Sequence, residues 1–240
     1  MIPNYLKREL NSKLKDGYLM GTSFKKKRKD FSLYMKLNFL PVFFIAIIYH
    51  LAFTENLSAQ DWNFIKERDG IKIYTRIEES TALKSFKGEA DLKTDMEKIS
   101  KVIEKIESYE LWNDDISEIK VLGYEKDKYI RYYLVYDVQW PFEDRDLCVE
   151  ALVTSDPVTG IRTIHATPLM GVVPEKPDMV RITNYWQEWK IEPAGNGIIH
   201  VTLEGSVDPG GSIPTWLINL VITDTPLKII MQVQQQVELK

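Results

Sequence analysis

Apolar and polar residues alternate along much of the second half of the chain, a pattern that predicts β-strands. In residues 198–207, for example, Ile199, Val201 and Leu203 alternate with polar residues, as in a strand with one buried face. The expected strands are residues 71–76, 83–92, 119–124, 129–138, 145–154, 161–167, 180–191 and 198–207, after a short helix or extended entry at 61–67. Because short turn sequences separate most of them, neighbouring strands are expected to be antiparallel.

One helix is expected between the early and the late strands. Thr94 and Glu97 form a capping-box pattern, and apolar residues follow at helical spacing up to Tyr109. A second helix is expected from Pro214 to about residue 237, interrupted at Pro226.

The two halves of the C-terminal helix differ in pattern. Residues 214–223 are apolar almost all round and are expected to be covered on more than one side, whereas residues 226–238 carry a single apolar stripe. The stripe consists of Leu227, Ile230, Val233 and Val237. The order of elements predicts an α+β fold in which a curved sheet wraps around the last helix.

Side-chain parity places charged and polar groups among the inward-facing apolar residues. Arg145 shares a strand face with Leu147 and Val149. In the strand expected at residues 180–191, polar groups likewise fall in register with Trp186. A tightly packed core seldom holds such groups unpaired, because burying an unpaired charge is costly.

The N-terminal part of the chain differs in composition. Basic residues gather at 25–29 and an apolar run follows at 39–48, which is the order of a signal peptide. We expect a basic leader or a misassigned start at 1–34, a signal peptide at 35–59 and one domain at 60–240. Cleavage would export the protein to the periplasm or the medium, whereas an uncleaved signal would anchor it in the membrane. Acidic residues outnumber basic ones in the expected domain, which argues against a nucleic-acid partner.

Three motifs resemble those of START domains, the StAR-related lipid-transfer family. They are Pro-Phe-Glu-Asp-Arg-Asp-Leu at 141–147, Trp-Asn at 112–113 ahead of the strand at 119, and Ile-Pro-Thr-Trp-Leu-Ile-Asn at 213–219 with a proline at 226. The last is most similar to the phosphatidylcholine-transfer branch of the family. The resemblance covers about residues 61–238.

The resemblance implies a helix-grip fold, in which an antiparallel sheet curves around a long C-terminal helix. It also implies a hydrophobic tunnel between sheet and helix that takes one lipid or other hydrophobic molecule, for transfer or sensing. Most members of the family are not enzymes. Tyr133 and Ala151 stand where sterol-binding relatives have a carboxylate and a second arginine, so the resemblance does not imply a sterol ligand.

Candidate site residues follow from parity and resemblance together. The residues expected to line the tunnel are Arg145, Leu147, Val149, Tyr133, Asn184, Trp186, Glu188, Ile199, Val201 and Leu203. Those expected to form a lid are Trp216, Leu217 and Leu220, with a hinge at Gly210 and Gly211. For the lid the alternative is ordinary packing of a helix on a sheet, and Trp186 and Tyr133 either line the cavity or belong to the core.

Arg145 is the strongest candidate for contact with a ligand. Its guanidinium could bind a phosphate or carboxylate headgroup with two parallel hydrogen bonds. The alternative is a structural ion pair with Asp146, Asp144 or Glu188.

Catalytic and metal-binding patterns are not found in the sequence. His165 and His200 lack metal-ligand spacing, and Cys148, the single cysteine, falls on the strand face opposite Leu147. We therefore expect no enzymatic activity, no cofactor and no metal, in a monomer that contacts membrane surfaces transiently. One alternative is an enzyme of the polyketide cyclase or aromatase type, with Arg145, Asn184, Glu188 and tyrosines around the substrate. A third possibility is an interaction module with a closed interior.

Overall fold

Strands dominate the structure, a computed structural model that describes residues 61–78, 81–107 and 115–238. These residues belong to one unit, Gln60–Lys240. Its strands are β1 (Asn63–Arg68), β2 (Ile71–Ile77), β3 (Lys84–Lys93), β4 (Ile116–Glu125), β5 (Tyr129–Tyr136), β6 (Asp144–Ser155), β7 (Arg162–Pro168), β8 (Met179–Arg181), β9 (Asn184–Gly195) and β10 (Ile198–Asp208). The helices are α2 (Met96–Glu104), α3 (Thr215–Val221) and α4 (Asp224–Glu238). The leader, the signal peptide and Trp112–Asn113 lie outside the described residues.

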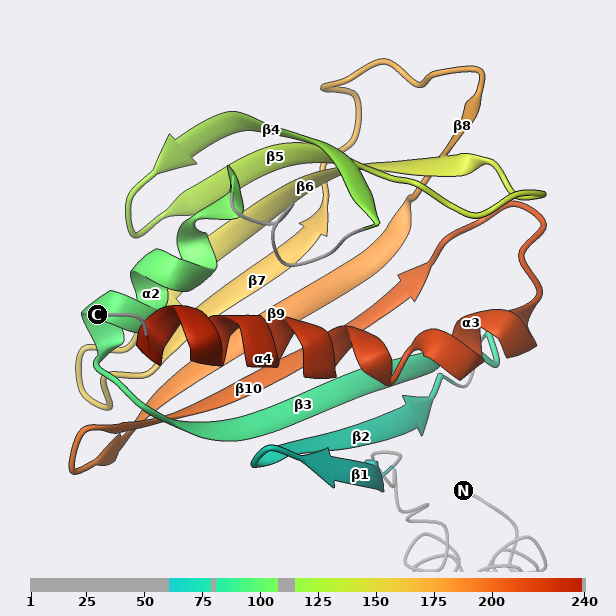
Figure 1. Cartoon of the computed structure of the whole chain (residues 1–240). Coiled ribbons are helices and arrows are strands. Elements are labelled where there is room, and N and C mark those ends of the chain that lie inside the picture. The colour runs from blue at the N-terminus through green and yellow to red at the C-terminus, as the bar shows by residue number, and fades with distance from the viewer. Residues whose placement is uncertain (1–60, 79–80, 108–114, 239–240) are drawn as a thin grey trace, which may run out of the picture. The chain divides into compact units, whose positions relative to one another are not determined.

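The strands form one sheet in the order β1-β2-β3-β10-β9-β7-β6-β5-β4, and all neighbours on this path are antiparallel. Of the strands in the described part of the chain, only β8 lies off the path, and it pairs parallel with the start of β6. The pairing register shifts once within β1 and twice within β4, the two strands at the ends of the sheet. Figure 1 shows the sheet curved with α4 lying across its concave face. The predicted α+β helix-grip fold is therefore confirmed.

The apolar stripe of α4 explains its position. Leu227, Ile230, Val233 and Val237 are buried, as predicted, and belong to one apolar cluster with the inner faces of β3 and β10. Similarly, α2 buries Ile99 and Ile103, although its N-cap is Asp95 rather than Thr94. The Asp95 carboxylate accepts a 2.8 Å hydrogen bond from the Lys98 backbone N–H.

The C-terminal helix breaks before Pro226, not at it. Because proline clashes with the carbonyl four residues earlier, the break falls at Ile222 and Thr223, between α3 and α4. The expectation that residues 214–223 are covered on more than one side is wrong for α3, in which no residue is fully buried. The Asn219 side chain joins α3 to the start of β3: its Oδ1 accepts a hydrogen bond from the Lys84 N–H (2.9 Å) and its Nδ2 donates one to the Ala82 carbonyl (3.1 Å). This helix therefore lies at the rim of the interior.

Gly88 sets how closely α4 approaches β3. A Cβ atom there would lie 2.6 Å from Ile230 Cδ1 and 3.1 Å from Pro226 Cβ. We expect Gly88→Ala to lower the free energy of unfolding by about 1–2 kcal/mol, because the fully buried Ile230 has little room to move. Urea denaturation followed by tryptophan fluorescence measures this loss. Gly123→Ala in β4 is the matched control, since its nearest neighbour atom would lie at 3.5 Å; equal stability of the two variants would contradict the close approach.

Candidate functional site

The inner face of the sheet is apolar, and five of the predicted tunnel residues lie on it. Leu147 and Val149 of β6 belong to the same buried cluster as α4. Ile199, Val201 and Leu203 of β10, three strands away from β6 in the sheet, belong to this cluster as well. Their contact with a ligand stays a prediction.

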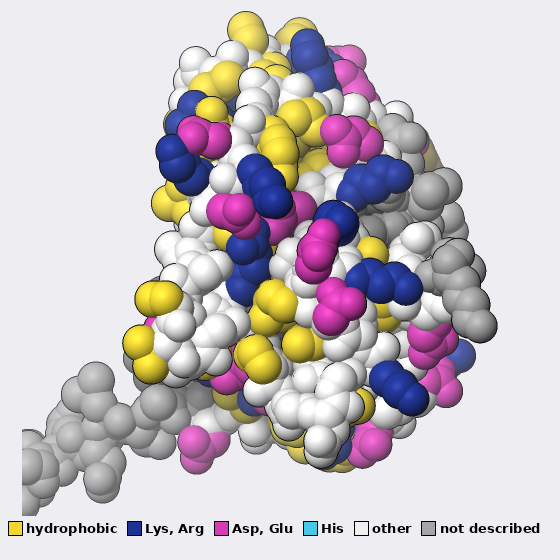
Figure 2. Space-filling model, turned by 90° about the vertical axis from the view of Figure 1, so that its left-hand side faces the viewer, with side chains coloured by type: hydrophobic (Ala, Val, Ile, Leu, Met, Phe, Trp, Pro, Cys, Tyr) yellow, Lys and Arg dark blue, Asp and Glu magenta, His cyan; other side chains and the backbone are white. Residues whose placement is uncertain are grey.

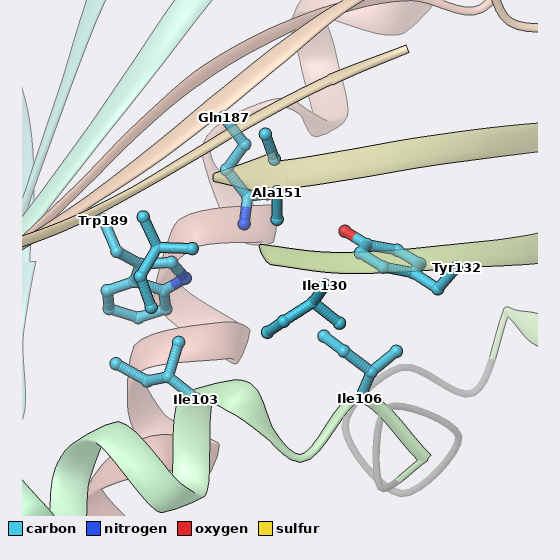
Figure 3. A pocket seen from close by; sticks show the side chains of 9 residues that line it. Ile103, Ile106, Ile130, Tyr132, Ala151, Gln187 and Trp189 are labelled. Carbon is cyan, nitrogen blue, oxygen red and sulfur yellow. The ribbon is translucent and has the colours of Figure 1, made fainter. Parts of the chain in front are cut away.

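A small cavity lies between α2 and the inner faces of four strands (Figure 3). It has a volume of about 10 Å³. Its lining consists of Ile103, Ile106, Ile130, Tyr132, Ala151, Ile164, Ala166, Gln187 and Trp189. None of these residues was among the predicted site residues. The signal was present in β5, where Ile130, Tyr132 and Leu134 alternate as an apolar face.

An open groove of about 780 Å³ adjoins this cavity, between α2 and the β4–β5 hairpin. Ile130 lines both the groove and the cavity. Figure 2 faces this end of the molecule and shows acidic and basic side chains close together. In the lining of this groove, Arg162 Nη2 lies 2.5 Å from Glu104 Oε1 and 2.8 Å from Asp127 Oδ1. Arg162 thereby ties the end of α2 and the β4–β5 turn to β7.

Tyr133 does not line the interior. It is buried with Val135 and Cys148 in a second cluster, separate from the one that contains α4. Successive side chains of a strand point to opposite faces, so Tyr132 and Leu134 take the inner positions of β5. The Tyr133 hydroxyl donates a 3.1 Å hydrogen bond to Asp146 Oδ2.

The sequence prediction is also wrong for three residues of β9 that it places in the tunnel lining: Asn184, Trp186 and Glu188. In β9 the buried residues are Trp189 and Ile191, so the inner positions carry odd numbers. The strand is interrupted at residues 182–183, between β8 and β9. Ile182 is buried at an even-numbered position, but even-numbered residues do not take the inner face of β9. On the exposed side of the sheet, Glu188 Oε2 lies 2.9 Å from His165 Nδ1.

Arg145 is only 2% exposed and is held by backbone carbonyls. Its Nε donates to the Pro209 carbonyl (3.3 Å), Nη2 donates to the Gly210 carbonyl (3.2 Å), and Nη1 donates to the Glu143 carbonyl. No carboxylate among the described residues forms an ion pair with Arg145, so the alternative of an ion pair with Asp146, Asp144 or Glu188 is wrong, and Asp146 pairs with Arg181 instead. Burial lowers the pKa of the Arg145 guanidinium, and the nearby Glu143 and Asp144 offset only part of this effect.

The predicted hinge is the segment that Arg145 holds. Gly210 and Gly211 have φ angles of +63° and +67°, which favour glycine. A Cβ atom on Gly211 would lie 2.9 Å from Arg145 Nη2. The segment therefore needs glycine both for its conformation and for the approach of the guanidinium.

The predicted lid residues lie on α3, which directly follows this segment. Trp216 is 68% and Leu220 67% exposed, whereas Leu217 is half-buried. The sequence of α3 contains no charged residue. The helix thus presents an uncharged apolar surface at the rim of the interior.

Comparison with known proteins gives the class to which this fold and site belong. No family model matches the chain. It is 31% identical over 185 residues to an uncharacterized protein of Pseudomonas aeruginosa, covering 76% of this chain and 90% of that relative. It is 28% identical over 170 residues to the phosphatidylcholine transfer protein of Rattus norvegicus, covering 68% and 77% of the two chains. A StAR-related lipid transfer protein of Xanthomonas axonopodis superposes with a TM-score of 0.67 at 27% identity, covering 73% and 98%.

These similarities show that the chain belongs to the START family of lipid-binding domains. The rat and Xanthomonas relatives are named as lipid-transfer proteins, in agreement with the predicted absence of enzymatic activity. The described residues contain no cluster of three potential metal ligands and no helix that is long and apolar enough to cross a membrane.

Proposed function

We propose that this START domain binds one lipid between α4 and the concave face of the sheet, and that α3 is the lid through which the lipid passes. The observation that carries the proposal is the uncharged, exposed apolar surface of α3 beside a buried apolar interior. The relatives named as lipid-transfer proteins support a lipid as ligand.

Lipid binding requires the interior to open. Pockets for small molecules typically occupy roughly 300–1,000 Å³, far above the volume of about 10 Å³ of the cavity beneath α2. Two glycines precede α3 and the helix break at 222–223 follows it, so α3 has a point of rotation at each end. Outward movement of α3 would open the interior with little change in the sheet.

The benefit of enclosing a lipid is large. An acyl chain of about 14 methylenes loses roughly 11 kcal/mol on entering water, at about 0.8 kcal/mol per methylene. An apolar interior replaces the contacts that the acyl chain makes in the bilayer, and it shortens the time that the chain spends in water.

The end of the domain that carries α3 is suited to a membrane surface. Trp140, 91% exposed, lies in the β5–β6 turn, and Arg145 connects this turn with the segment before α3 through the Glu143 and Pro209 carbonyls. Tryptophan rings partition well into the membrane interface. We propose that α3 and Trp140 contact the bilayer together during lipid exchange. Export through a signal peptide at 35–59 remains part of the proposal.

The test is lipid transfer by a lid variant. We expect Leu220→Glu to slow transfer of fluorescent phosphatidylcholine between vesicles by about tenfold or more, because a charge on α3 opposes entry into the apolar interface. Val158→Glu is the matched control, since Val158 is 91% exposed in the β6–β7 turn at the other end of β6. Transfer by Leu220→Glu at the wild-type rate would exclude the lid role, and a wild-type protein that loads no lipid would refute lipid binding.

The cyclase alternative is not supported. It requires Asn184 and Glu188 to face the substrate, and the parity of β9 places both on the side away from the buried core.

A further inference from the structure

Three side chains with hydrogen-bonding groups, Tyr132, Gln187 and Trp189, interrupt the apolar lining of the cavity beneath α2. The indole Nε1 of Trp189 is buried without a hydrogen-bond partner among the described residues, and Trp189 is only 2% exposed. Gln187, two residues earlier on the same inner face of β9, also lines the cavity. Figure 3 shows the Trp189 nitrogen and the Gln187 amide on the sides of these residues that face the other lining groups.

An unpaired donor at this position has an energetic cost. A buried N–H without an acceptor destabilises a protein by roughly 1–3 kcal/mol, a cost that an aromatic residue without a donor, such as phenylalanine, does not carry. The cavity volume of about 10 Å³ lies at the lower limit for a single water molecule. The fold thus keeps a donor directed at a space for one small acceptor atom.

The chemistry of the lining narrows the acceptor. An indole N–H can only donate, and the Gln187 amide offers further N–H donors. The lining contains no charged side chain, which disfavours a phosphate or a free carboxylate. A carbonyl oxygen is neutral and has two lone pairs, so it can accept from both groups at once.

We propose that this cavity is the subsite for a carbonyl oxygen of an ester-linked lipid, bound by Trp189 Nε1 and the Gln187 amide. The inference rests on the proposed lipid-binding function and specifies the chemical class of the ligand. Entry of the lipid moves α2 or α4 and so widens the cavity. The carbonyl oxygen of the lipid then occupies the small space beside Trp189 Nε1.

The test compares two lipids that differ only at the proposed contact. Purified protein is incubated with vesicles of equal parts diacyl phosphatidylcholine and its dialkyl ether analogue with the same chains, and extracted lipid is quantified by mass spectrometry. We expect the wild-type protein to load the diacyl lipid with a preference of about fivefold or more, the equivalent of one net hydrogen bond. Trp189→Phe and Gln187→Leu are each expected to reduce this preference to about twofold or less.

Trp186→Phe is the matched control, because Trp186 lies on the same strand at an outward position. It is expected to keep the wild-type preference. Since the measurement is a ratio between two lipids in one sample, a partial loss of folded protein does not change it.

Each outcome decides between the two proposals. Equal loading of both lipids by the wild-type protein would overturn the carbonyl subsite while supporting lipid binding. An ester preference that persists in both Trp189→Phe and Gln187→Leu would also overturn the subsite. Loading of neither lipid would overturn lipid binding itself, and with it this inference.

Discussion

Replacing Asp146 with asparagine is expected to lower the free energy of unfolding by about 3–5 kcal/mol, the range observed when one partner of a buried ion pair is removed. Asp146 accepts two hydrogen bonds from Arg181, from Nε at 2.7 Å and from Nη2 at 2.8 Å, and both side chains are almost fully buried. Arg181 also donates to the Val173 and Pro174 carbonyls, so losing the carboxylate leaves a buried charge and loosens the β7–β8 connection. Urea denaturation of the variant measures the loss.

The same pair predicts how stability depends on pH. Burial alone would raise the pKa of Asp146, but the hydrogen bonds and charge of Arg181 outweigh it, so the pKa lies below its ordinary value. A carboxylate with a lowered folded-state pKa contributes stability above its unfolded pKa of about 3.9 and loses it as the pH falls through the folded value. The stability difference between the wild-type protein and Asp146→Asn should therefore be full near neutral pH and shrink in acid below about pH 4.

The control for Asp146 is the more exposed pair of Arg131 and Glu150. Glu150→Gln is expected to change the free energy of unfolding by about 1 kcal/mol or less. Equal losses in the two variants, or a difference that does not shrink in acid, would contradict the assigned role of Asp146.

Replacing Arg145 with methionine is expected to lower the free energy of unfolding by about 2–4 kcal/mol, because three backbone carbonyls lose their donor. Two of these carbonyls belong to Pro209 and Gly210, so amide hydrogen exchange should increase selectively in the residues before α3. Mass spectrometry of peptic peptides after exchange measures this effect. Unchanged exchange before α3 would show that Arg145 does not hold the segment.

Lipid loading separates this structural role of Arg145 from headgroup binding. Arg145→Lys keeps the positive charge but not the planar group that reaches three carbonyls. If the folded methionine and lysine variants both load phosphatidylcholine as well as the wild-type protein does, Arg145 does not contact the ligand. Loading that is lost with methionine and retained with lysine would favour contact of the charge with a phosphate.

Periodicity was sufficient for the fold because most of the long strands, together with α2 and α4, bury one regular face. The inner face of β10 and the stripe of α4 follow directly from residue spacing, and the three motifs at 112–113, 141–147 and 213–219 together indicate the family. The alternation of side chains predicts the wrong face where two residues outside the strand pairing shift which positions point inward. The break at 182–183 reverses the faces of β9, so the sequence pattern favours Trp186 at an inner position that Trp189 takes in the structure.

The remaining errors concern tertiary placement, which spacing does not encode. The family resemblance favours Tyr133 in the cavity, although the apolar alternation of β5 favours Tyr132 on the inner face. The apolar sequence of α3 indicated a covered helix, but its position at the rim leaves Trp216 and Leu220 exposed. An apolar helix can be buried in the core, or it can be exposed as a binding surface for an apolar partner. Sequence alone does not distinguish these two cases.

The register shifts in β1 and β4 affect how the protein behaves at high concentration. An open sheet ends in two strands whose free N–H and C=O groups can pair with a strand of another molecule. Here the first strand shifts register between Phe64 and Lys66, and the last shifts twice, at residues 116–118 and 121–123. Such bulges bend a strand and increase its local twist. Neither border of the sheet therefore offers a long straight template, which protects a protein rich in β-structure from edge-to-edge aggregation.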